Sequence, residues 1–365
     1  MEKTKNNSTV WKVLSVVLAC ILMVVTALYV TDNKKSCAPS SDGQEAVLAS
    51  WTDDAKAKDE LVSYVSAVTD ESSDSFIPAE DRIAVFDLDG TLACETDPSY
   101  FDHAIYYYRV MEDPSYKDKA SDFEKEVAAE VKQLMDTGVS APDSMVHHGK
   151  GVASAFEGMT PEEFISYVVD FANTPEPGYE GMTRAEAFYK PMLEVVDYLE
   201  QNDFTVYVVS GTDRFIVRGL VEASPLDIPA NQIIGSDESL VATDQGDTDG
   251  LEYKFDDDDQ LVMGGEFLIK NLDMNKVTAI QQEIGKQPVL SFGNSGSDSS
   301  MAEYATNNNK YPAKAFMLCC DDTVRENGNE EKAQKMAKSC EENGWTAISM
   351  KNDWKTIYGD NVTKK

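Results

Sequence analysis

The chain has 365 residues, of which 42% are hydrophobic, so it is long enough for about two domains with buried cores and is neither disordered nor fibrous. Lys and Arg total 32 against 65 Asp and Glu, which gives a formal net charge of −33. A nucleic-acid binder needs a basic surface to meet the phosphate backbone, so this charge argues against nucleic acid as a partner.

The first predicted element is an apolar segment close to the N-terminus. Residues 13–30 carry no charge and are about long enough to cross a bilayer once. We expect a cytoplasmic N-terminus (1–12), a transmembrane anchor (13–30) and a linker (31–45), with the rest of the chain extracytoplasmic. A cleaved signal segment and a lipid anchor at Cys20 are the two alternatives, and both also export the chain.

A helical extension and the first core strand are predicted over residues 46–95. Apolar residues recur at helical spacing over 45–68, and a polar connection follows. Residues 82–86 then form a short, largely apolar run that ends in acidic residues. Such a run suits a parallel strand that is buried on both faces.

Similar apolar runs recur at 204–209, 289–292 and 315–318, next to helical patterns at 191–200, 215–222 and 276–284. Strands that alternate with helices predict an α/β fold with a mainly parallel sheet. Polar residues follow several of these strands, and ligands of such sheets bind at the carboxyl ends of the strands.

Two segments interrupt this alternation. Residues 96–190 carry helical patterns at 100–110, 120–135 and 161–171 and predict an inserted helical domain. Residues 238–267 predict a β-hairpin with acidic turns. The core is therefore expected to resume at 191–365, with this hairpin as an insertion.

The strongest chemical signal follows the first strand. Asp87 and Asp89 are two residues apart, so both carboxylates are expected on the same side of the chain. Gly90 permits a tight turn, and Thr91 adds a hydroxyl. Of two clustered carboxylates, one can act as nucleophile while the other, its proton affinity raised by its neighbour, acts as general acid and then base.

Residues 87–92 (DLDGTL) resemble the first motif of the haloacid dehalogenase-like hydrolase superfamily, and three further motifs follow in order. Residues 206–211 resemble the second motif, Lys276 the third and residues 293–298 (GNSGSD) the fourth. The resemblance covers about residues 82–301 and is closest to the phosphoserine phosphatase-like branch. It implies a Rossmann-like core with a helical cap, and the chain's end at 344–354 is similar to that of exported bacterial members.

The resemblance also implies roles for residues of this chain. Asp87 attacks phosphorus to form an aspartyl-phosphate, and Asp89 protonates the leaving oxygen and then activates water. Ser210, the Gly211 N–H, Lys276 and Thr91 hold the phosphoryl group. These phosphate-binding residues would supply most of the stabilisation of a phosphoryl-transfer transition state. Lys270 competes with Lys276 for the third motif, but Lys276 begins the helix at the expected distance before Asp298.

A Mg²⁺ ion is implied as cofactor, with Asp87, Asp89, Asn294 and Asp298 as the metal site. One position departs from the family pattern, because Asn294 stands where an Asp is usual. An amide oxygen can still bind Mg²⁺, but the lost charge should weaken metal binding or make Asp298 the direct ligand.

Other reactive side chains favour structural roles. Cys340 either pairs with Cys319 or Cys320 or remains a buried free thiol. Cys94 is expected to be a packing residue, because no His is near it in sequence. His147 and His148 are expected to form an exposed loop pair, and Arg109, Arg184 and Arg214 are expected to be solvent-facing or ion-paired rather than substrate anchors.

These observations predict an Mg²⁺-dependent phosphatase that hydrolyses a small phosphorylated substrate, is anchored in the membrane by its N-terminal helix and has no protein partner. A phosphotransferase or mutase of the same superfamily is the nearest alternative. A catalytically weak surface protein that binds metal or anions is the other, because of Asn294 and the net charge.

Overall fold

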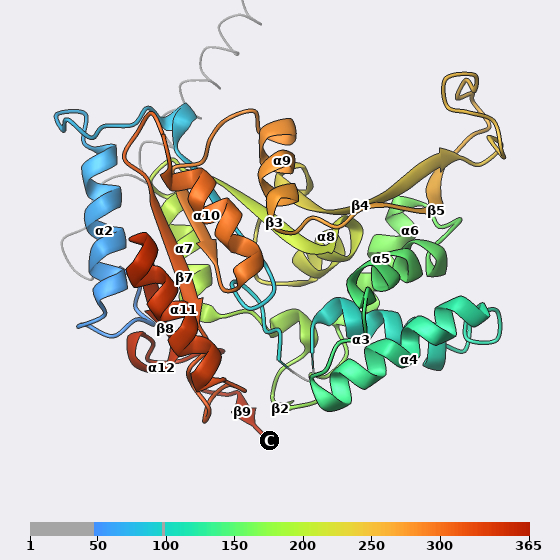
Figure 1. Cartoon of the computed structure of the whole chain (residues 1–365), viewed down its shortest axis with the longest axis horizontal. Coiled ribbons are helices and arrows are strands. Elements are labelled where there is room, and N and C mark those ends of the chain that lie inside the picture. Colours follow the sequence, from blue (N-terminus) through green and yellow to red (C-terminus); the bar gives the residue numbers. More distant parts are fainter. Residues whose placement is uncertain (1–46, 97–98) are drawn as a thin grey trace, which may run out of the picture. The chain divides into compact units, whose positions relative to one another are not determined.

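The computed structural model describes residues 47–96 and 99–365, which contain one seven-stranded sheet (Figure 1). Its strands lie in the order β5-β4-β3-β1-β6-β7-β8, and all neighbours are parallel except β4 and β5. The strands are β1 (Ile83–Phe86), β3 (Thr205–Asp213), β4 (Ile233–Ala242), β5 (Leu261–Ile269), β6 (Leu290–Gly293), β7 (Lys314–Cys319) and β8 (Thr346–Ser349). The predicted α/β class with a mainly parallel sheet is confirmed.

The expected membrane segment at 13–30 and the linker at 31–45 lie outside the described residues. Among the residues that the structure does describe, no helix is both long and apolar enough to cross a bilayer.

The central strands β1 and β6 are covered on both faces. All four residues of β1 and all four of β6 are buried. Ala84 in β1 pairs with Val206 in β3 on one side and with Leu290 in β6 on the other. A strand enclosed in this way has no solvent-facing side chains, which explains its continuous apolar sequence.

Helices connect the strands and pack beside the sheet (Figure 1). They are α2 (Lys56–Thr69), α7 (Lys190–Glu200), α8 (Arg214–Ala223), α9 (Met274–Glu283), α10 (Ser299–Thr306), α11 (Glu330–Asn343) and α12 (Met350–Asp353). The predicted helical segments at 191–200, 215–222 and 276–284 fall on α7, α8 and α9. The strand patterns at 204–209, 289–292 and 315–318 fall on β3, β6 and β7.

The N-terminal extension differs from the prediction. Its helix begins only at Lys56, and Leu48 and Trp51 before it are buried against the body of the protein instead of continuing the helix. Trp51 forms an isolated antiparallel bridge with Trp354, and its indole N–H donates to the Pro191 carbonyl at 3.0 Å. The apolar residues before Lys56 are therefore spaced as in a helix although they lie outside one, which explains why the sequence predicted a longer helix.

Among the described residues, four α-helices lie between β1 and α7, and we refer to them as the cap helices. They are α3 (Phe101–Tyr107), which continues as a π-helical turn (Tyr108–Glu112), α4 (Asp122–Thr137), α5 (Ser144–Ala155) and α6 (Pro161–Ala172). Ser121 and Thr160 begin α4 and α6 as capping boxes, each satisfying a free backbone N–H group. Helix α5 was not predicted.

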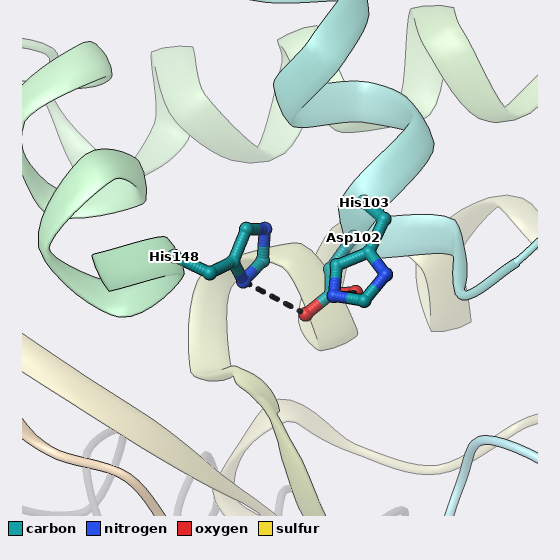
Figure 2. Close-up of side chains that lie close together, drawn as sticks. All are labelled: Asp102, His103 and His148. Carbon is teal, nitrogen blue, oxygen red and sulfur yellow. Dashed lines mark ion pairs between the residues drawn. The ribbon is translucent and has the colours of Figure 1, made fainter. Parts of the chain in front are cut away.

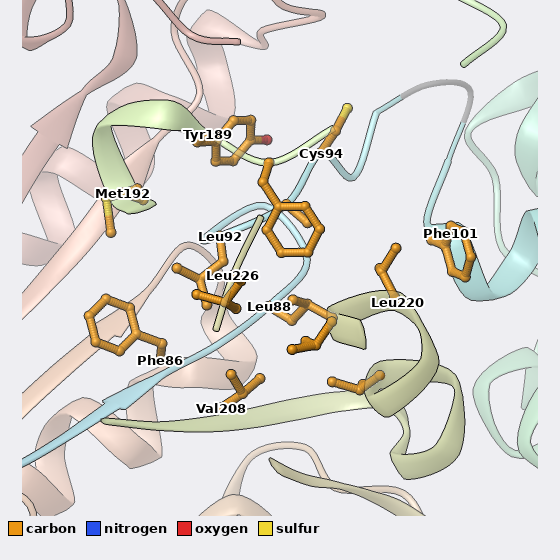
Figure 3. Close-up of a cluster of buried hydrophobic side chains, with 14 of the residues drawn as sticks. Phe86, Leu88, Leu92, Cys94, Phe101, Tyr189, Met192, Val208, Leu220 and Leu226 are labelled. Atoms are coloured by element: carbon orange, nitrogen blue, oxygen red, sulfur yellow. The ribbon is translucent and has the colours of Figure 1, made fainter. Parts of the chain in front are cut away.

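The loop after β1 is held in place by leucines that belong to the hydrophobic core (Figure 3). Leu88 and Leu92 are completely buried, in the same cluster as Phe86, Val208 and Leu226. Because these leucines anchor the loop, the acidic residues between them are held in a defined position at the carboxyl end of β1.

The four cysteines among the described residues are all free. Of the two possibilities for Cys340, the structure therefore has the buried free thiol and no bond to Cys319 or Cys320. Cys94 is buried in the core, as expected for a packing residue. The last strand, β9 (Thr363–Lys364), pairs with β2 (Tyr179–Glu180) in a separate two-stranded sheet.

Candidate active site

The acidic loop after β1 is connected to the neighbouring strand and turns back at a glycine. The Asp87 N–H donates to the Phe292 carbonyl of β6 at 2.9 Å. Gly90 has a φ of +79°, and a Cβ there would lie 1.9 Å from Asn294 Nδ2. Only glycine fits this close approach, so the loop can meet the segment that follows β6. The Thr91 hydroxyl lies 3.3 Å from Asp87 Oδ2.

Lys276 in α9 joins the first and fourth motifs. Its Nζ lies 2.6 Å from Asp87 Oδ1 and 2.7 Å from Asp298 Oδ1, and its side chain is completely buried. Burial would lower the pKa of this amine, but the charges of Asp298 and Asp87 raise it above its ordinary value. Lys276 is therefore a permanent cation between two carboxylates. Lys270 lies in the wall of the adjacent cavity.

Asp89 is held in a form that favours a bound proton. Burial, followed by the negative charges of Asp102 and Asp87, raises its pKa well above the ordinary value. Its Oδ2 accepts a hydrogen bond from Thr212 Oγ1 at 2.8 Å, whereas its Oδ1 is buried and has no partner. A protonated carboxyl group beside the ionisable Asp87 is the arrangement that a general acid requires.

The second motif lies at the end of β3, next to Asp89. Ser210 is completely buried, and its hydroxyl lies 3.5 Å from Asp89 Oδ2. Gly211 and Thr212 line the cavity in front of the two acids. Sequence reasoning missed Thr212, although its position two residues after Ser210 on a strand was a usable signal, since side chains two apart lie on the same face.

In the fourth motif, Asp298 is occupied by other partners. Its Oδ1 binds Lys276, and its Oδ2 accepts from the backbone N–H groups of Asn294 (3.1 Å) and Ser295 (3.0 Å) and from the Ser295 hydroxyl (3.0 Å). Asp298 thus positions the amine and the loop. Asn294, in contrast, lies in the cavity wall with Asp87 and Asp89.

Glu95 is a further acidic residue of this site that sequence reasoning missed. It lines the same cavity, and its carboxyl group lies beside Asn294, since a Cβ at Gly90 would be within 2.7 Å of both side chains. Burial raises the pKa of Glu95 to about 7; a hydrogen bond from Asn294 opposes this shift, and the charge of Asp87 adds to it. No sequence signal distinguishes Glu95 from the other acids near the motif.

These donors fit the implied Mg²⁺ ion. The carboxyl groups of Asp87 and Glu95 and the side-chain amide of Asn294 line one cavity beside the protonated Asp89, and they offer the oxygen ligands that Mg²⁺ requires. Burial, followed by the charge of Asp298, raises the pKa of Asp87 to about 6, and burial is also the largest cause of the raised pKa of Glu95. A bound cation would favour the charged form of both carboxyl groups and so oppose these shifts.

The cavity lies between the sheet and the cap helices and has a volume of about 310 Å³. On the sheet side its wall contains the acids of the first motif together with Gly211 and Thr212. On the cap side it contains, among others, Tyr100, Asp102, His103, Glu130 and His148. A space of this size accommodates a small molecule.

The expectation for His148 was wrong. His147 and His148 lie on α5 rather than on a loop, and consecutive helical residues point about 100° apart. His147 is half exposed and faces Glu130, but only 3% of His148 is exposed.

The arginine expectations agree with the structure. Arg214 is ion-paired with Asp237 and Glu283, each at 2.7 Å. Arg109 pairs with Asp113 at 3.1 Å, and Arg184 lies 3.4 Å from Glu176. Each of the three arginines is therefore already ion-paired and is not free to anchor a substrate.

The family model of the haloacid dehalogenase-like hydrolases matches residues 84–303, more than half of the chain. The chain belongs to this family. The expected family is thereby confirmed, and with it the assignment of an enzyme.

Solved structures that match the chain have low sequence identity to it. A conserved protein of unknown function from Anaerococcus prevotii is 13% identical, with 80% of this chain and 91% of that chain covered and a TM-score of 0.49. Cytosolic 5'-nucleotidase IIIB bound to cytidine is 10% identical (84% and 92% covered, TM-score 0.48). A phosphoserine phosphohydrolase-like protein from Francisella tularensis is 16% identical (73% and 94%, TM-score 0.39). No curated protein matches the sequence.

Proposed function

We propose that the protein is an Mg²⁺-dependent phosphomonoesterase that hydrolyses a small phosphorylated metabolite through an aspartyl-phosphate. The observation that carries this proposal is the contact of Lys276 with Asp87 beside an Asp89 whose pKa is raised. Transfer of a phosphoryl group to a carboxylate requires two groups: a nucleophile held by a fixed cation, and a neighbouring acid.

In the first step, Asp87 Oδ2 attacks phosphorus while Oδ1 stays bound to Lys276. The bond between phosphorus and the leaving oxygen breaks, and Asp89 gives its proton to that oxygen. In the second step, Asp89 takes a proton from water, and the resulting hydroxide attacks phosphorus and releases Asp87. Thr212 keeps the Asp89 carboxyl group in place by its hydrogen bond at 2.8 Å.

The phosphoryl oxygens would be held by the Gly211 N–H group and by the hydroxyls of Ser210 and Thr91. A bound Mg²⁺ would supply positive charge to the phosphoryl oxygens. We propose that Glu95 replaces the negative charge that Asn294 lacks, because the two side chains are adjacent in the cavity wall.

The location of the enzyme is a separate proposal. We propose that residues 13–30 anchor the protein in the membrane, with residues 1–12 in the cytoplasm and the catalytic body outside. The support is the uncharged 18-residue run and the three lysines before it. Protease treatment of intact cells tests this topology: the body should be degraded while the cells stay sealed, and protection of the body would contradict it. Secretion after cleavage, or a lipid anchor, would instead give a body without residues 1–12.

The catalytic proposal is tested by phosphate release from an aryl phosphate, using the full-length chain in detergent with and without Mg²⁺. We expect Mg²⁺-dependent release that is lost in Asp87→Asn. Activity in Asp87→Asn would refute the nucleophile. Transfer to an added alcohol in place of water would instead indicate a phosphotransferase, and a folded, Mg²⁺-saturated protein without turnover on a broad phosphomonoester panel would favour the binding protein that Asn294 suggests.

A further inference from the structure

Three side chains of the cap helices meet at the wall of the cavity opposite the acidic loop (Figure 2). Asp102 and His103 belong to α3, and His148 belongs to α5. His148 Nδ1 lies 3.7 Å from Asp102 Oδ2, and His103 Nε2 lies 4.0 Å from Asp102 Oδ1. One ligand atom from each residue lies within 4.8 Å of the other two.

The polar groups of this cluster are incompletely paired, although they are buried. Only 4% of Asp102 and 3% of His148 is exposed. Asp102 Oδ1, which faces His103, has no hydrogen-bond partner, and neither does His148 Nε2. An unpaired buried carboxylate oxygen is costly, so such atoms in a folded protein indicate a missing partner.

A hydrogen bond from outside the cluster orients one of its rings. His103 Nδ1 lies 3.0 Å from Ser99 Oγ, which leaves Nε2 directed towards Asp102. The rings of His103 and His148 stand edge to face with centroids 4.7 Å apart. In metal sites, a second hydrogen bond of this kind fixes the ring orientation of a ligating histidine.

We propose that Asp102, His103 and His148 bind a divalent transition-metal ion of the Zn²⁺ type in the cap, separate from the Mg²⁺ at Asp87. Two imidazole nitrogens and one carboxylate oxygen suit such an ion, whereas Mg²⁺ prefers the oxygen-only set on the other wall. Ligand atoms around a transition metal at about 2.1 Å are roughly 3–4 Å apart, so modest side-chain shifts would close the triad.

The surroundings of the triad are consistent with a bound cation. Asp89, Glu95 and Glu130 line the same cavity, and Lys270 is the cation that opposes them there. Three protein ligands leave a fourth position open towards the cavity, where a donor atom of the substrate can bind.

The experiment uses Co²⁺ as an optical probe of the full-length chain in detergent with excess Mg²⁺, which keeps the oxygen-only site filled. We expect about one equivalent of Co²⁺ to bind with the visible absorption of a nitrogen-ligated ion. His148→Asn and His103→Asn should each weaken Co²⁺ binding at least 10-fold. His147→Asn is the matched control, because this neighbouring histidine faces Glu130 instead, and it should bind Co²⁺ like the unchanged protein.

A second measurement needs no variant and no activity. Zn²⁺ at about 100 times its dissociation constant should raise the Tm of the unchanged protein by roughly 3–4 °C in excess Mg²⁺. Absence of both the Co²⁺ absorption and the Zn²⁺ shift in the unchanged protein would overturn the proposal. So would Co²⁺ binding that depends on His147 and not on His148. Neither readout depends on phosphatase activity.

Discussion

Lys276→Met should destabilise the protein strongly even without substrate or metal. The amine is completely buried and lies 2.6 Å from one carboxylate and 2.7 Å from another, Asp87 and Asp298. At an effective dielectric constant of about 20, each contact is worth roughly 6 kcal/mol, and the desolvation of three buried charges cancels much of this. Removing one partner of such a pair costs about 3–5 kcal/mol, because the remaining charges stay buried.

The assay is thermal or urea unfolding in metal-free buffer at pH 7. With about 4 kcal/mol lost, the Tm should fall by roughly 5–6 °C in a protein of this size. The control is Lys286→Met, which removes a contact of the same length (2.7 Å to Asp81) from a half-exposed amine and should cost under about 1 kcal/mol.

Two further results separate charge from packing. Asp298→Asn in the Lys276→Met background should recover part of the loss, since one buried charge is removed. Lowering the pH towards 4 should also reduce the difference in unfolding free energy between Lys276→Met and the unchanged protein, because the unpaired carboxylates then bind protons in the folded state. A Lys276→Met protein within about 1 kcal/mol of the unchanged one would refute the reasoning.

Four other substitutions test separate features of the site and the sheet. Glu95→Gln should weaken Mg²⁺ binding about 10-fold and Asn294→Asp should tighten it, as measured by calorimetric titration; unchanged affinity in both variants would exclude the charge replacement. Thr212→Val should lower kcat about 10-fold with little change in KM, because it removes the hydrogen bond that positions Asp89; a change in KM alone would argue for a binding role. Burial and two acidic neighbours raise the pKa of Glu238 to about 10, so the folded state keeps a proton that the unfolded state releases, and stability falls as the pH rises above about 4.5. Glu238→Gln should therefore raise the free energy of unfolding by up to about 3 kcal/mol at pH 7 and by almost nothing at pH 4. An equal increase at both pH values would contradict this reasoning.

The parallel sheet could be predicted from the sequence because its central strands are buried on both faces. Such strands are short, apolar and bounded by polar turns, and β1 and β6 show this pattern directly. Helix α5 was missed for the opposite reason. Its glycines lower helix propensity, yet they permit close packing, since a Cβ at Gly151 would lie 2.5 Å from the Tyr106 hydroxyl oxygen. Tertiary contact thus stabilises a helix whose local sequence does not favour one.

Site residues that lie next to a strand end in the sequence could be predicted, whereas residues that only the tertiary structure brings to the site could not. Asp87 and Asp89 directly follow a strand. Lys276, which the sequence assigned to the third motif, contacts Asp87 in the structure. Glu95 and His148 carry no local signal. Glu95 reaches Asn294 only because Gly90 lets two distant segments meet, and His148 faces the cavity because of the rotation of α5.

The position of β1 in the middle of the sheet also has a consequence for biosynthesis. Its two partner strands are far away in the chain, since Ala84 pairs with Val206 on one side and with Leu290 on the other. At about 5–20 residues per second, the second partner leaves the ribosome roughly 10–40 s after β1. During that time an entirely apolar strand has an unpaired edge, which is prone to aggregate. The nascent chain is therefore exposed to aggregation at the β1 edge until its second partner strand has been made, and Asp87 cannot meet Lys276 before residue 276 has left the ribosome.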